Sequence, residues 1–281
     1  MTFTTRFAPS PTGHLHLGHA YSACLAYAMA HAAKGRFLLR IEDTDTARSQ
    51  RHFENQIYDD LGWLGLTWET PVLHQSRNSA AYDAALHRLG QLGLLYPCSC
   101  TRGDIRRAAS APQEGAPLHG PDGLIYPGTC RHRAWDDRAD TDAVRLDMQR
   151  ALHHLGALPH YQETGVVAAI PLTDQHMITE IGDVVLARRD TGMAAYHLSV
   201  VVDDAAQGIT HVVRGKDLAA ATPIHVLLQA LLGLPTPVYH HHALIRDEAG
   251  KRLAKRDDAR AIATYRAEGL SPQEVKALVS L

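Results

Sequence analysis

Three histidines and two glycines stand where the chain passes from a short strand into a helix near its amino terminus. The stretch FAPSPTGHLHLGHA covers residues 7–20. Such a turn points unpaired backbone N–H groups and the positive end of the helix dipole into the same space. His16 and His19 are three residues apart, so they share a face of the first helical turn, and Gly18 leaves the backbone open to a flat ligand. The stretch by itself fits two interpretations equally well: a site for an anion such as phosphate, and a solvated, histidine-rich helix cap.

A second group of charged residues lies more than 200 positions further along the chain. GKRLAKRD, residues 250–257, places Lys251, Arg252, Lys255 and Arg256 after a glycine. A charge run of this kind is most often a solvated surface, so alone it predicts no site. The first stretch likewise matches neither the GxxxxGK[ST] phosphate-binding loop nor the GxGxxG dinucleotide fingerprint.

Three of the four cysteines lie close enough in sequence to form a metal site. Cys98, Cys100 and Cys130 are an odd set, which argues against a disulfide framework and favours a metal in an intracellular protein. Three thiolates hold Zn²⁺ tightly, and Tyr126, His119 or His132 can supply a fourth ligand, imidazole being the commoner one. The alternative is three unconnected thiols. Cys24 lies on the apolar face of the first predicted helix and is expected in the core.

The elements that must position these residues alternate between strand and helix. The pattern predicts a parallel sheet wrapped by helices up to residue 93, with Asp and Thr of DTDTARS capping the second helix. Residues 101–136 show no sustained period and predict an inserted loop or small module, and residues 142–170 look irregular or antiparallel. The predicted strands are 4–8, 35–42 and 71–75; the predicted helices are 16–33, one ending near 64, and 76–93. Residues 183–215 then predict strand pairs, a helix and a strand returning to the sheet, followed by a helix at 219–233.

Composition sets broad limits on function. The chain has 281 residues, a net charge of −2 and 19 histidines, so no global basic field indicates nucleic acid, although a local basic face remains compatible with it. No apolar run approaches the ~20 residues that span a bilayer, and no signal peptide precedes the first strand. We therefore expect a cytoplasmic protein with no membrane partner.

The two charged motifs together resemble a known family. HLGH followed by RLAKR resembles the HIGH and KMSKS signatures of class I aminoacyl-tRNA synthetases, which flank ATP on a Rossmann-like fold. RFAPSPTGHLHLGHA, LLRIEDTDTARS, AYHLSVVVDDAAQGITHVVRGKDL and TPIHVLLQALLG resemble the glutamyl-tRNA synthetase catalytic core across residues 4–256. The chain ends 25 residues after Arg256, so we expect no anticodon-binding domain. The Cys98-Ser-Cys100 and Tyr126-x3-Cys130 pattern makes the insert similar to that of the truncated paralogues, the glutamyl-queuosine tRNA(Asp) synthetases.

This resemblance implies a fold and a division of the chain. The fold is α/β: a class I synthetase Rossmann-like parallel sheet with a zinc-stapled insertion. The Rossmann-like catalytic domain occupies residues 1–95 and 183–245, and a zinc-containing insertion, similar to an acceptor-end subdomain, occupies 96–182. Residues 246–281 hold the KMSKS-like loop and a short helical remnant. Because the spacing from Tyr126 to Cys130 matches that of the paralogues, the resemblance implies Tyr126 as the fourth ligand of one structural Zn²⁺ per chain.

The resemblance also implies site residues. The match assigns glutamate binding to Arg6, Phe7, Ala8, Pro9, Ser10, Glu42, Tyr196 and Arg214. It assigns ATP binding to His16, Gly18, His19, Arg252, Leu253, Ala254, Lys255 and Arg256, with His16, His19 and Lys255 catalytic and Mg²⁺ accompanying ATP. Two arginines suit a substrate with two carboxylates, because each guanidinium can bind one bidentately. Arg252 and Ala254 depart from the usual KMSKS pattern, so the role of Arg252 stays open.

The implied activity is that of a ligase. Glutamate is activated with ATP, without tRNA, and transferred to the queuosine base at the wobble position of tRNA(Asp), whose anticodon stem-loop is the expected RNA partner of a monomeric enzyme. Arginines of the insert are candidate phosphate contacts: Arg102, Arg106, Arg107, Arg131 and Arg133. The alternatives are a discriminating glutamyl-tRNA synthetase core that charges the tRNA 3′ end, and a non-catalytic RNA- or zinc-binding paralogue.

Overall fold

The computed structural model describes residues 2–109, 119–245 and 260–279, and its centre is a parallel β-sheet. Its strands are β1 (Thr4–Phe7), β2 (Arg36–Ile41), β3 (Glu69–His74), β9 (His211–Gly215) and β10 (Val238–His242). The pairs β1–β2, β2–β3 and β9–β10 are all parallel. The backbone N–H of Thr210 donates to the carbonyl of Thr4 at 3.0 Å, which places β9 beside β1. The strand order is therefore β10-β9-β1-β2-β3.

This order creates a topological switch point between β1 and β9. The chain continues from β1 to β2 on one side, whereas β9 arrives on the other side after more than 200 residues. The amino ends of β1 and β9 meet at Thr4 and Thr210, so their carboxyl ends open at the same edge of the sheet. Open α/β sheets bind ligands at such an edge, because the loops diverge there and leave a crevice.

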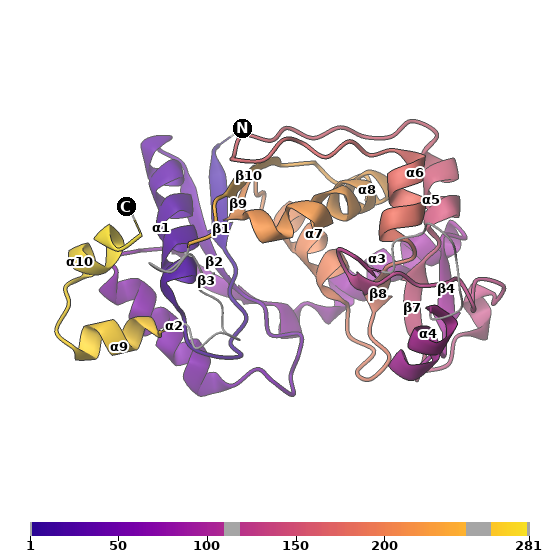
Figure 1. Ribbon diagram of the computed structural model, residues 1–281, viewed down its shortest axis with the longest axis horizontal. Helices are drawn as coiled ribbons and strands as arrows, with labels where there is room; N and C mark the ends of the chain where they lie inside the picture. Colours follow the sequence, from indigo (N-terminus) through magenta and orange to yellow (C-terminus); the bar gives the residue numbers. More distant parts are fainter. Residues whose placement is uncertain (1, 110–118, 246–259, 280–281) are drawn as a thin grey trace.

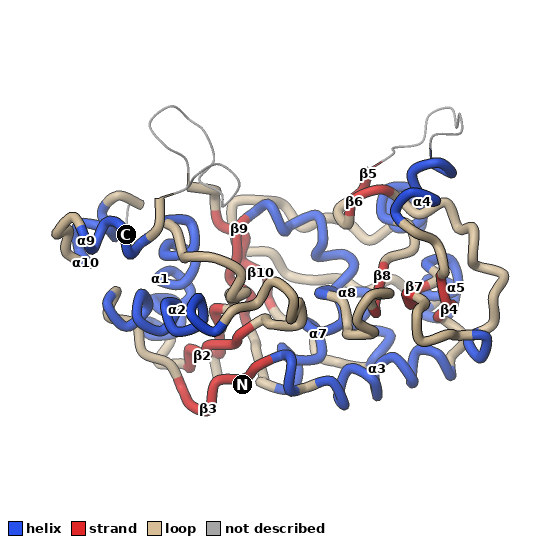
Figure 2. The backbone as a smooth tube through the Cα atoms, turned by 90° about the horizontal axis from the view of Figure 1, so that it is seen from below, coloured by secondary structure: helices blue, strands red, loops and turns tan. Residues whose placement is uncertain are grey.

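Helices cover both faces of the sheet, as Figures 1 and 2 show. On one side lie α1 (Leu17–Ala32) and α2 (Arg51–Trp63), and on the other α7 (Tyr196–Ala206) and α8 (Thr222–Leu232). The alternation along β2 explains the two cores: Phe37, Leu39 and Ile41 belong to the core of α1 and α2, whereas Leu38 belongs to that of α3 (Ser79–Gln91), α7 and α8. Both faces of the strand are buried, as expected for a parallel strand covered by helices, and the Leu38 face also carries Arg40.

A smaller antiparallel sheet lies at the end of the molecule away from α9 (Ile262–Ala267) and α10 (Pro272–Ala277) (Figure 1). It consists of β4 (Leu95–Cys98), β7 (Ala143–Leu146) and β8 (Val185–Ala187) in the order β4-β7-β8. The segment between β4 and β8 also contains α4 (Arg102–Ala109), the hairpin β5 (His119–Gly120) with β6 (Gly123–Leu124), α5 (Met148–Leu155) and α6 (Asp174–His176). The antiparallel sheet confirms that the alternating strands and helices of the predicted parallel sheet stop after residue 94.

Two local expectations are wrong. The second helix is not capped by Asp or Thr: α2 begins at Arg51, after Gln50, which makes no side-chain cap. Residues 142–170 are not wholly irregular or antiparallel, because α5 begins after Asp147, whose carboxylate accepts from the backbone N–H of Arg150. The apolar residues Met148, Ala151, Leu152 and Leu155 carry a helical period that is only two turns long and therefore easily missed.

An extra segment extends the sheet beyond β10. Residues 162–166 run beside this strand, where Thr164 N–H donates to the Tyr239 carbonyl and Val166 N–H donates to the His241 carbonyl. A Cβ atom at Gly165 would lie 2.1 Å from the carbonyl oxygen of His241, so this close approach requires glycine. The segment brings Glu163 against the ring of His241, whose Nδ1 lies 2.5 Å from Glu163 Oε2. In the described parts of the chain, no helix is long and apolar enough to cross a membrane.

Candidate active site

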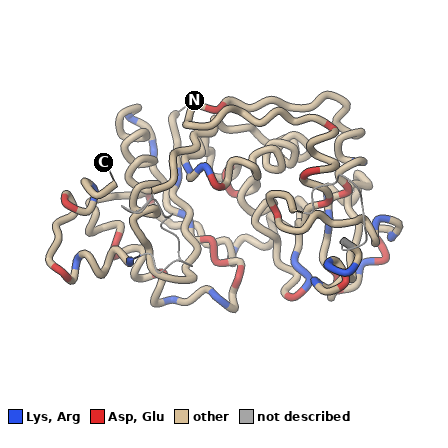
Figure 3. Tube along the Cα trace, in the orientation of Figure 1, with Lys and Arg blue, Asp and Glu red and all other residues tan. Residues whose placement is uncertain are grey.

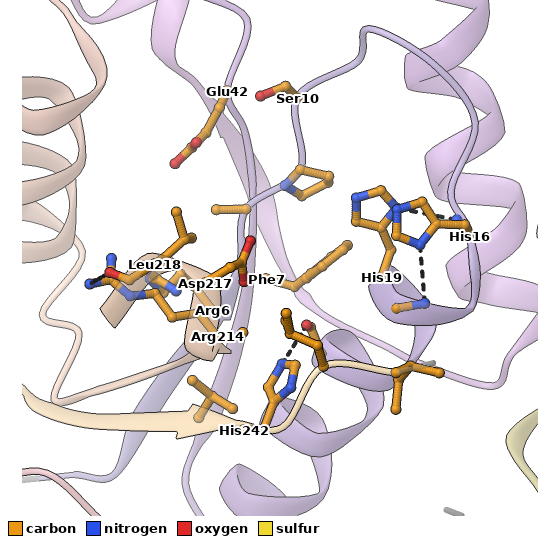
Figure 4. A pocket seen from close by; sticks show the side chains of 18 of the residues that line it. Arg6, Phe7, Ser10, His16, His19, Glu42, Arg214, Asp217, Leu218 and His242 are labelled. Atoms are coloured by element: carbon orange, nitrogen blue, oxygen red, sulfur yellow. Dashed lines mark hydrogen bonds between the residues drawn. The ribbon is translucent and has the colours of Figure 1, made fainter. Parts of the chain in front are cut away.

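A cavity of about 560 Å³ opens at the carboxyl ends of β1 and β9 (Figure 4). It is lined by the turn after β1, the first turn of α1, the residue after β2, the first residue of α7 and the ends of β9 and β10. The sequence-predicted residues in its wall are Arg6, Phe7, Ala8, Pro9, Ser10, His16, Gly18, His19, Glu42, Tyr196 and Arg214. The fold thus brings together the whole predicted glutamate set and the three described ATP residues; their roles stay predictions.

The two histidines form the cap of α1. His16 is the N-cap residue, and its Nδ1 accepts from the backbone N–H of Gly18 at 3.1 Å. His19 Nδ1 accepts in turn from the backbone N–H of His16 at 3.2 Å, and the rings stack with centroids 3.7 Å apart. His16 therefore precedes the helix rather than lying in its first turn, and the N–H of Gly18 is already bonded to an imidazole. Acceptance at Nδ1 leaves the proton of each neutral ring on Nε2.

Arg214 is held at the cavity wall by uncharged groups. Its Nη2 donates to Thr222 Oγ1 at 2.7 Å and to the Leu218 carbonyl at 3.2 Å. Its Nε donates to His241 Nε2 at 3.0 Å, and its Nη1 donates to His225 Nδ1 at 3.2 Å and to Tyr196 Oη at 3.4 Å. The side chain is buried, and the structure gives it no ion pair with any described carboxylate. A buried cation without a counter-ion is costly, so the arrangement favours an anionic ligand.

Arg6 has a different environment, because it is paired inside the protein. Its Nε and Nη2 donate to the two carboxylate oxygens of Asp204 at 3.0 and 3.3 Å. Asp204 also accepts from Arg40 Nη1 at 2.7 Å, and Arg40 Nη2 donates to Glu42 at 3.2 Å. The expected bidentate grip of Arg6 on a substrate carboxylate is therefore not open through its Nε–Nη2 edge. Figure 3 shows basic and acidic positions meeting at the centre of the molecule, where α7 faces the sheet.

Burial and charge act in opposite directions on the two carboxylates of this network. Burial raises the pKa of Glu42, and the nearby Arg40 and Arg6 only partly offset it. Burial also opposes ionisation of Asp204, but the attraction of Arg6 and Arg40 outweighs it and lowers the pKa of that carboxyl. Asp204 is therefore an anion at neutral pH that fixes both arginines.

Sequence reasoning missed Arg40 and Asp204, although both left a signal. Arg40 interrupts the apolar strand FLLRI, and Asp203 and Asp204 interrupt the apolar helix segment SVVVDDAA. Charged residues are almost never fully buried unless they are paired, and Arg40 is fully buried. A cation in one buried element and two acids in another therefore indicate an ion pair between them.

The far wall of the cavity holds further residues that the sequence did not indicate. Ser22 Oγ lies 2.6 Å from His242 Nε2, and His242 Nδ1 donates to the Ala243 carbonyl at 2.8 Å. Both side chains line the cavity, together with Thr12, Val213, Gly215, Asp217, Leu218, Leu244 and Ile245. The predicted loop residues Arg252, Leu253, Ala254, Lys255 and Arg256 lie outside the described residues, which end at 245 before this loop.

The three cysteines converge as a metal site requires. Among the described residues, the sulfur atoms of Cys98, Cys100 and Cys130 form a group within 4.8 Å of one another, and neither His119 nor His132 joins it. The Sγ atoms of Cys100 and Cys130 are 3.6 Å apart, close to the ~3.8 Å edge of a tetrahedron with Zn–S bonds of about 2.3 Å. Tyr126 Oη lies 3.3 Å from Cys98 Sγ and 3.4 Å from Cys100 Sγ. The three cysteines could therefore hold a metal ion, and Tyr126 Oη lies beside them.

The donors differ in how readily they lose a proton, and burial raises the pKa of Tyr126. Burial raises the pKa of Cys130, but hydrogen bonds from Tyr126 and from the Ser99 backbone outweigh it and bring it to about 7. Burial raises the pKa of Cys100 to about 11. A cation bound among the sulfurs would favour both thiolates.

Two of the five insert arginines are engaged inside the fold. Arg131 Nε pairs with Asp183 at 2.5 Å, and Arg133 Nη2 pairs with Asp142 at 2.8 Å. On α4, Arg102 and Arg106 are exposed, and Arg107 is exposed and paired with Asp104. The basic surface available to a phosphate backbone is therefore carried by α4 rather than by all five residues.

Comparisons with known proteins agree with this geometry. Residues 2–281 match the family model of tRNA synthetases class I (E and Q), catalytic domain. The chain is 58% identical to the glutamyl-Q tRNA(Asp) synthetase of Rhodobacter capsulatus over 99% of both sequences. It is 44% identical to that of Nocardia farcinica, over 98% of this chain and 83% of the relative.

Solved structures share the fold at low sequence identity. The glutamate-tRNA synthetase of Elizabethkingia anophelis superposes with a TM-score of 0.77 at 24% identity, covering 100% of this chain and 62% of that one. Methionyl-tRNA synthetase of Mycobacterium tuberculosis gives 0.61 at 12% identity, covering 99% and 64%. The chain thus spans slightly more than three fifths of these solved chains, and at these identities the likeness concerns the fold alone.

Proposed function

Because the chain belongs to the class I tRNA synthetases of the glutamate and glutamine group, and is a ligase of that group, we propose that it activates L-glutamate with ATP and transfers it to queuosine in tRNA(Asp). The activation proceeds without tRNA and produces glutamyl-adenylate. The observation that carries the proposal is the cavity wall, where the buried Arg214, which has no counter-ion among the described residues, lies across from a histidine-capped helix terminus. The RNA substrate in this proposal is inferred from the names of the relatives.

We propose the following orientation for glutamate in the cavity. Its side-chain carboxylate accepts from Arg214 and Tyr196, replacing the long contact of 3.4 Å between these two side chains. Its ammonium group pairs with Glu42, while the turn of residues 7–10 encloses the backbone of the amino acid. Arg6 lines the cavity, but Asp204 occupies its Nε–Nη2 edge and compensates its charge, so it offers no bidentate grip there. The α-carboxylate then points towards the cap of α1.

The first reaction step needs no nucleophilic side chain. An α-carboxylate oxygen attacks the α-phosphorus of ATP, the bond to the β-phosphate oxygen breaks, and pyrophosphate leaves with the bonding electrons. His16 and His19 orient the phosphates from the cap of α1, and Lys255 offsets the developing charge, to which Mg²⁺ bound with ATP would add. Catalysis is therefore positioning and charge stabilisation.

In the second step, a hydroxyl of the queuosine cyclopentenediol attacks the activated carbonyl carbon. AMP leaves with the bonding electrons, and the hydroxyl proton passes to the departing phosphate or to water. RNA of this kind is recognised in loops whose bases can be turned out of the stack. Arg102, Arg106 and Arg107 on α4 are the proposed phosphate contacts, so activity should fall with rising salt.

The proposal includes one structural Zn²⁺ per chain, held by Cys98, Cys100, Cys130 and Tyr126. The supporting observation is the group of three sulfurs within 4.8 Å. The ion would tie β4 to the segment before β7, since Cys98 ends β4 and Cys130 precedes β7. The proposal also places the enzyme in the cytoplasm as a monomer, where ATP and tRNA are available.

One assay tests the activity and separates the alternatives. ATP–pyrophosphate exchange is measured with glutamate, glutamine and aspartate, with and without tRNA. Labelled glutamate is then offered to queuosine-containing tRNA(Asp) without its terminal adenosine, to unmodified tRNA(Asp) and to tRNA(Glu). We expect tRNA-independent exchange with glutamate and label on the truncated queuosine tRNA alone. Label only at the 3′ end of tRNA(Glu) would identify an ordinary synthetase core, and no exchange at all a non-catalytic paralogue.

A further inference from the structure

His225 lies behind the cavity wall, and nothing in its sequence context marks it as functional. It is 1% exposed, is carried by α8 and contacts Arg214 through Nδ1. We propose that His225 is a positioning residue that makes the cavity specific for a carboxylate, because it holds Arg214 as a neutral acceptor and leaves the guanidinium charge for the ligand. This inference rests on the proposed function and deepens it.

The hydrogen bonds of Arg214 account for all five of its N–H groups. Four of them, to His241, His225, Thr222 and the Leu218 carbonyl, are 2.7 to 3.2 Å long. The fifth, to Tyr196 Oη, is the longest at 3.4 Å, and Tyr196 lines the cavity. The four shorter bonds fix the plane of the guanidinium, and the loose fifth position is the one a ligand oxygen can take.

The direction of each hydrogen bond behind Arg214 follows from chemistry. A guanidinium only donates, so His225 Nδ1 carries no proton and the proton lies on Nε2. That Nε2 is 3.1 Å from His197 Nδ1, which must accept. His197 Nε2 then faces Asp122 Oδ1 at 3.3 Å, in the turn between β5 and β6. The carboxylate at the end of the series keeps both imidazoles in the tautomer that Arg214 needs.

The surroundings of His225 oppose its protonation. The titratable and charged groups that face it are Arg214 and Arg6, His197 on α7, His241 on β10 and Tyr196 at the start of α7. Burial, followed by the charge of Arg214, lowers the pKa of His225 well below its usual value. Burial and Arg214 also lower the pKa of His241, although Glu163 on the other side of that ring opposes the shift.

A carboxylate in place of His225 would compensate the charge of Arg214 instead of leaving that charge for the ligand. Arg6 shows this case in the same molecule, since Asp204 occupies its Nε–Nη2 edge and compensates its charge. Of the two arginines in the wall, Arg214 therefore carries the charge that distinguishes glutamate from glutamine. Sites built to bind one group reject the analogue that lacks it.

The test compares His225→Asn with His225→Asp, which have the same shape and differ in charge. Asn keeps a neutral acceptor near the position of Nδ1, whereas Asp pairs with Arg214. Calorimetric titration of the whole protein with L-glutamate and L-glutamine should show glutamate binding within roughly fivefold of wild type for the Asn variant. The Asp variant should lose roughly tenfold or more in glutamate affinity but not in glutamine affinity. Equal glutamate affinities in two variants with native melting temperatures would overturn the inference.

A spectroscopic measurement tests whether His225 is a neutral acceptor without relying on an activity assay. In protein labelled with ¹⁵N-histidine, the His225 ring should remain neutral, with its proton on Nε2, from about pH 5.5 to about pH 8. A ring that titrates with an ordinary pKa, or that carries its proton on Nδ1, would refute the neutral acceptor. Glutarate, which has the terminal carboxylate without the ammonium group, separates the two proposals. If glutarate binds the wild-type protein and binds the Asp variant more weakly, the inference holds even if glutamate activation is absent. Equal binding of glutarate to the two proteins would overturn the inference.

Discussion

Replacing Asp204 with asparagine removes one negative charge from a buried network without changing the shape of the side chain. Asp204 accepts from Arg6 at 3.0 and 3.3 Å and from Arg40 at 2.7 Å. The side chains of Arg6 and Arg40 are 6% and 0% exposed, so water cannot replace the lost partner. Removing one member of a buried pair costs about 3–5 kcal/mol, because the other charge stays buried and unpaired. Arg6 loses its carboxylate partner, whereas Arg40 keeps Glu42 at 3.2 Å and Asp203 at 3.9 Å, so we expect a loss near the lower end, about 3 kcal/mol.

Equilibrium unfolding in urea at neutral pH measures this loss, and the chain offers a matched control. Arg36 and Glu69 form the same two-bonded geometry, at 2.8 and 2.6 Å, but with side chains 46% and 47% exposed. Glu69→Gln should therefore cost less than about 1 kcal/mol. A loss for Asp204→Asn no larger than that for Glu69→Gln would refute the reasoning that burial makes the difference.

The same pair of proteins gives a pH dependence whose sign follows from the pKa. The pKa of Asp204 in the folded protein lies below its ordinary value of 3.8. A carboxyl with a lowered pKa contributes stability above its unfolded pKa, and this contribution is lost as pH falls through the folded one. The stability difference between wild type and Asp204→Asn should therefore be constant from pH 7 to about pH 5 and shrink below about pH 4. A difference that grows on acidification would contradict the assignment of Asp204 as the buried anion.

The remaining predictions concern the metal and the substrates. Purified protein should contain about one equivalent of zinc, and the Cys130→Ser variant should contain none. In the presence of a chelator, the Tyr126→Phe variant should release its zinc faster than the His132→Ala variant. Freshly purified protein without zinc would exclude the site. His19→Ala should slow adenylate formation by roughly 10²-fold, mainly in kcat, and activity within about twofold of wild type would show that the ATP site is elsewhere. Arg214→Ala should raise KM for glutamate at least about tenfold, corresponding to the ~1.5–3 kcal/mol of a charge-assisted hydrogen bond, with ATP binding nearly intact; an unchanged KM would remove Arg214 from the substrate site.

The sequence by itself determined the local elements and the residue types of the site. The strand at 4–8, the helix from 16 and the strand at 35–42 correspond to β1, α1 and β2 because their apolar periods are long and unambiguous. The motif blocks indicated the family that the comparisons show, since they match in type, order and spacing. The short helix α5 escaped because two turns of period carry little signal.

Only the tertiary structure decided which charges meet. Arg40 and Asp204 are 164 residues apart, and no local pattern pairs them. The groups that accept hydrogen bonds from Arg214 come from α7, α8, β10 and the segment before α8. These neutral partners surround Arg214 only when the sheet places β9 between β1 and β10. Hydrophobic periodicity fixes which face of an element is buried, whereas the partner of a buried charge depends on the element packed against that face. Which arginine is held by neutral groups, and which is engaged by Asp204, is therefore a property of the fold.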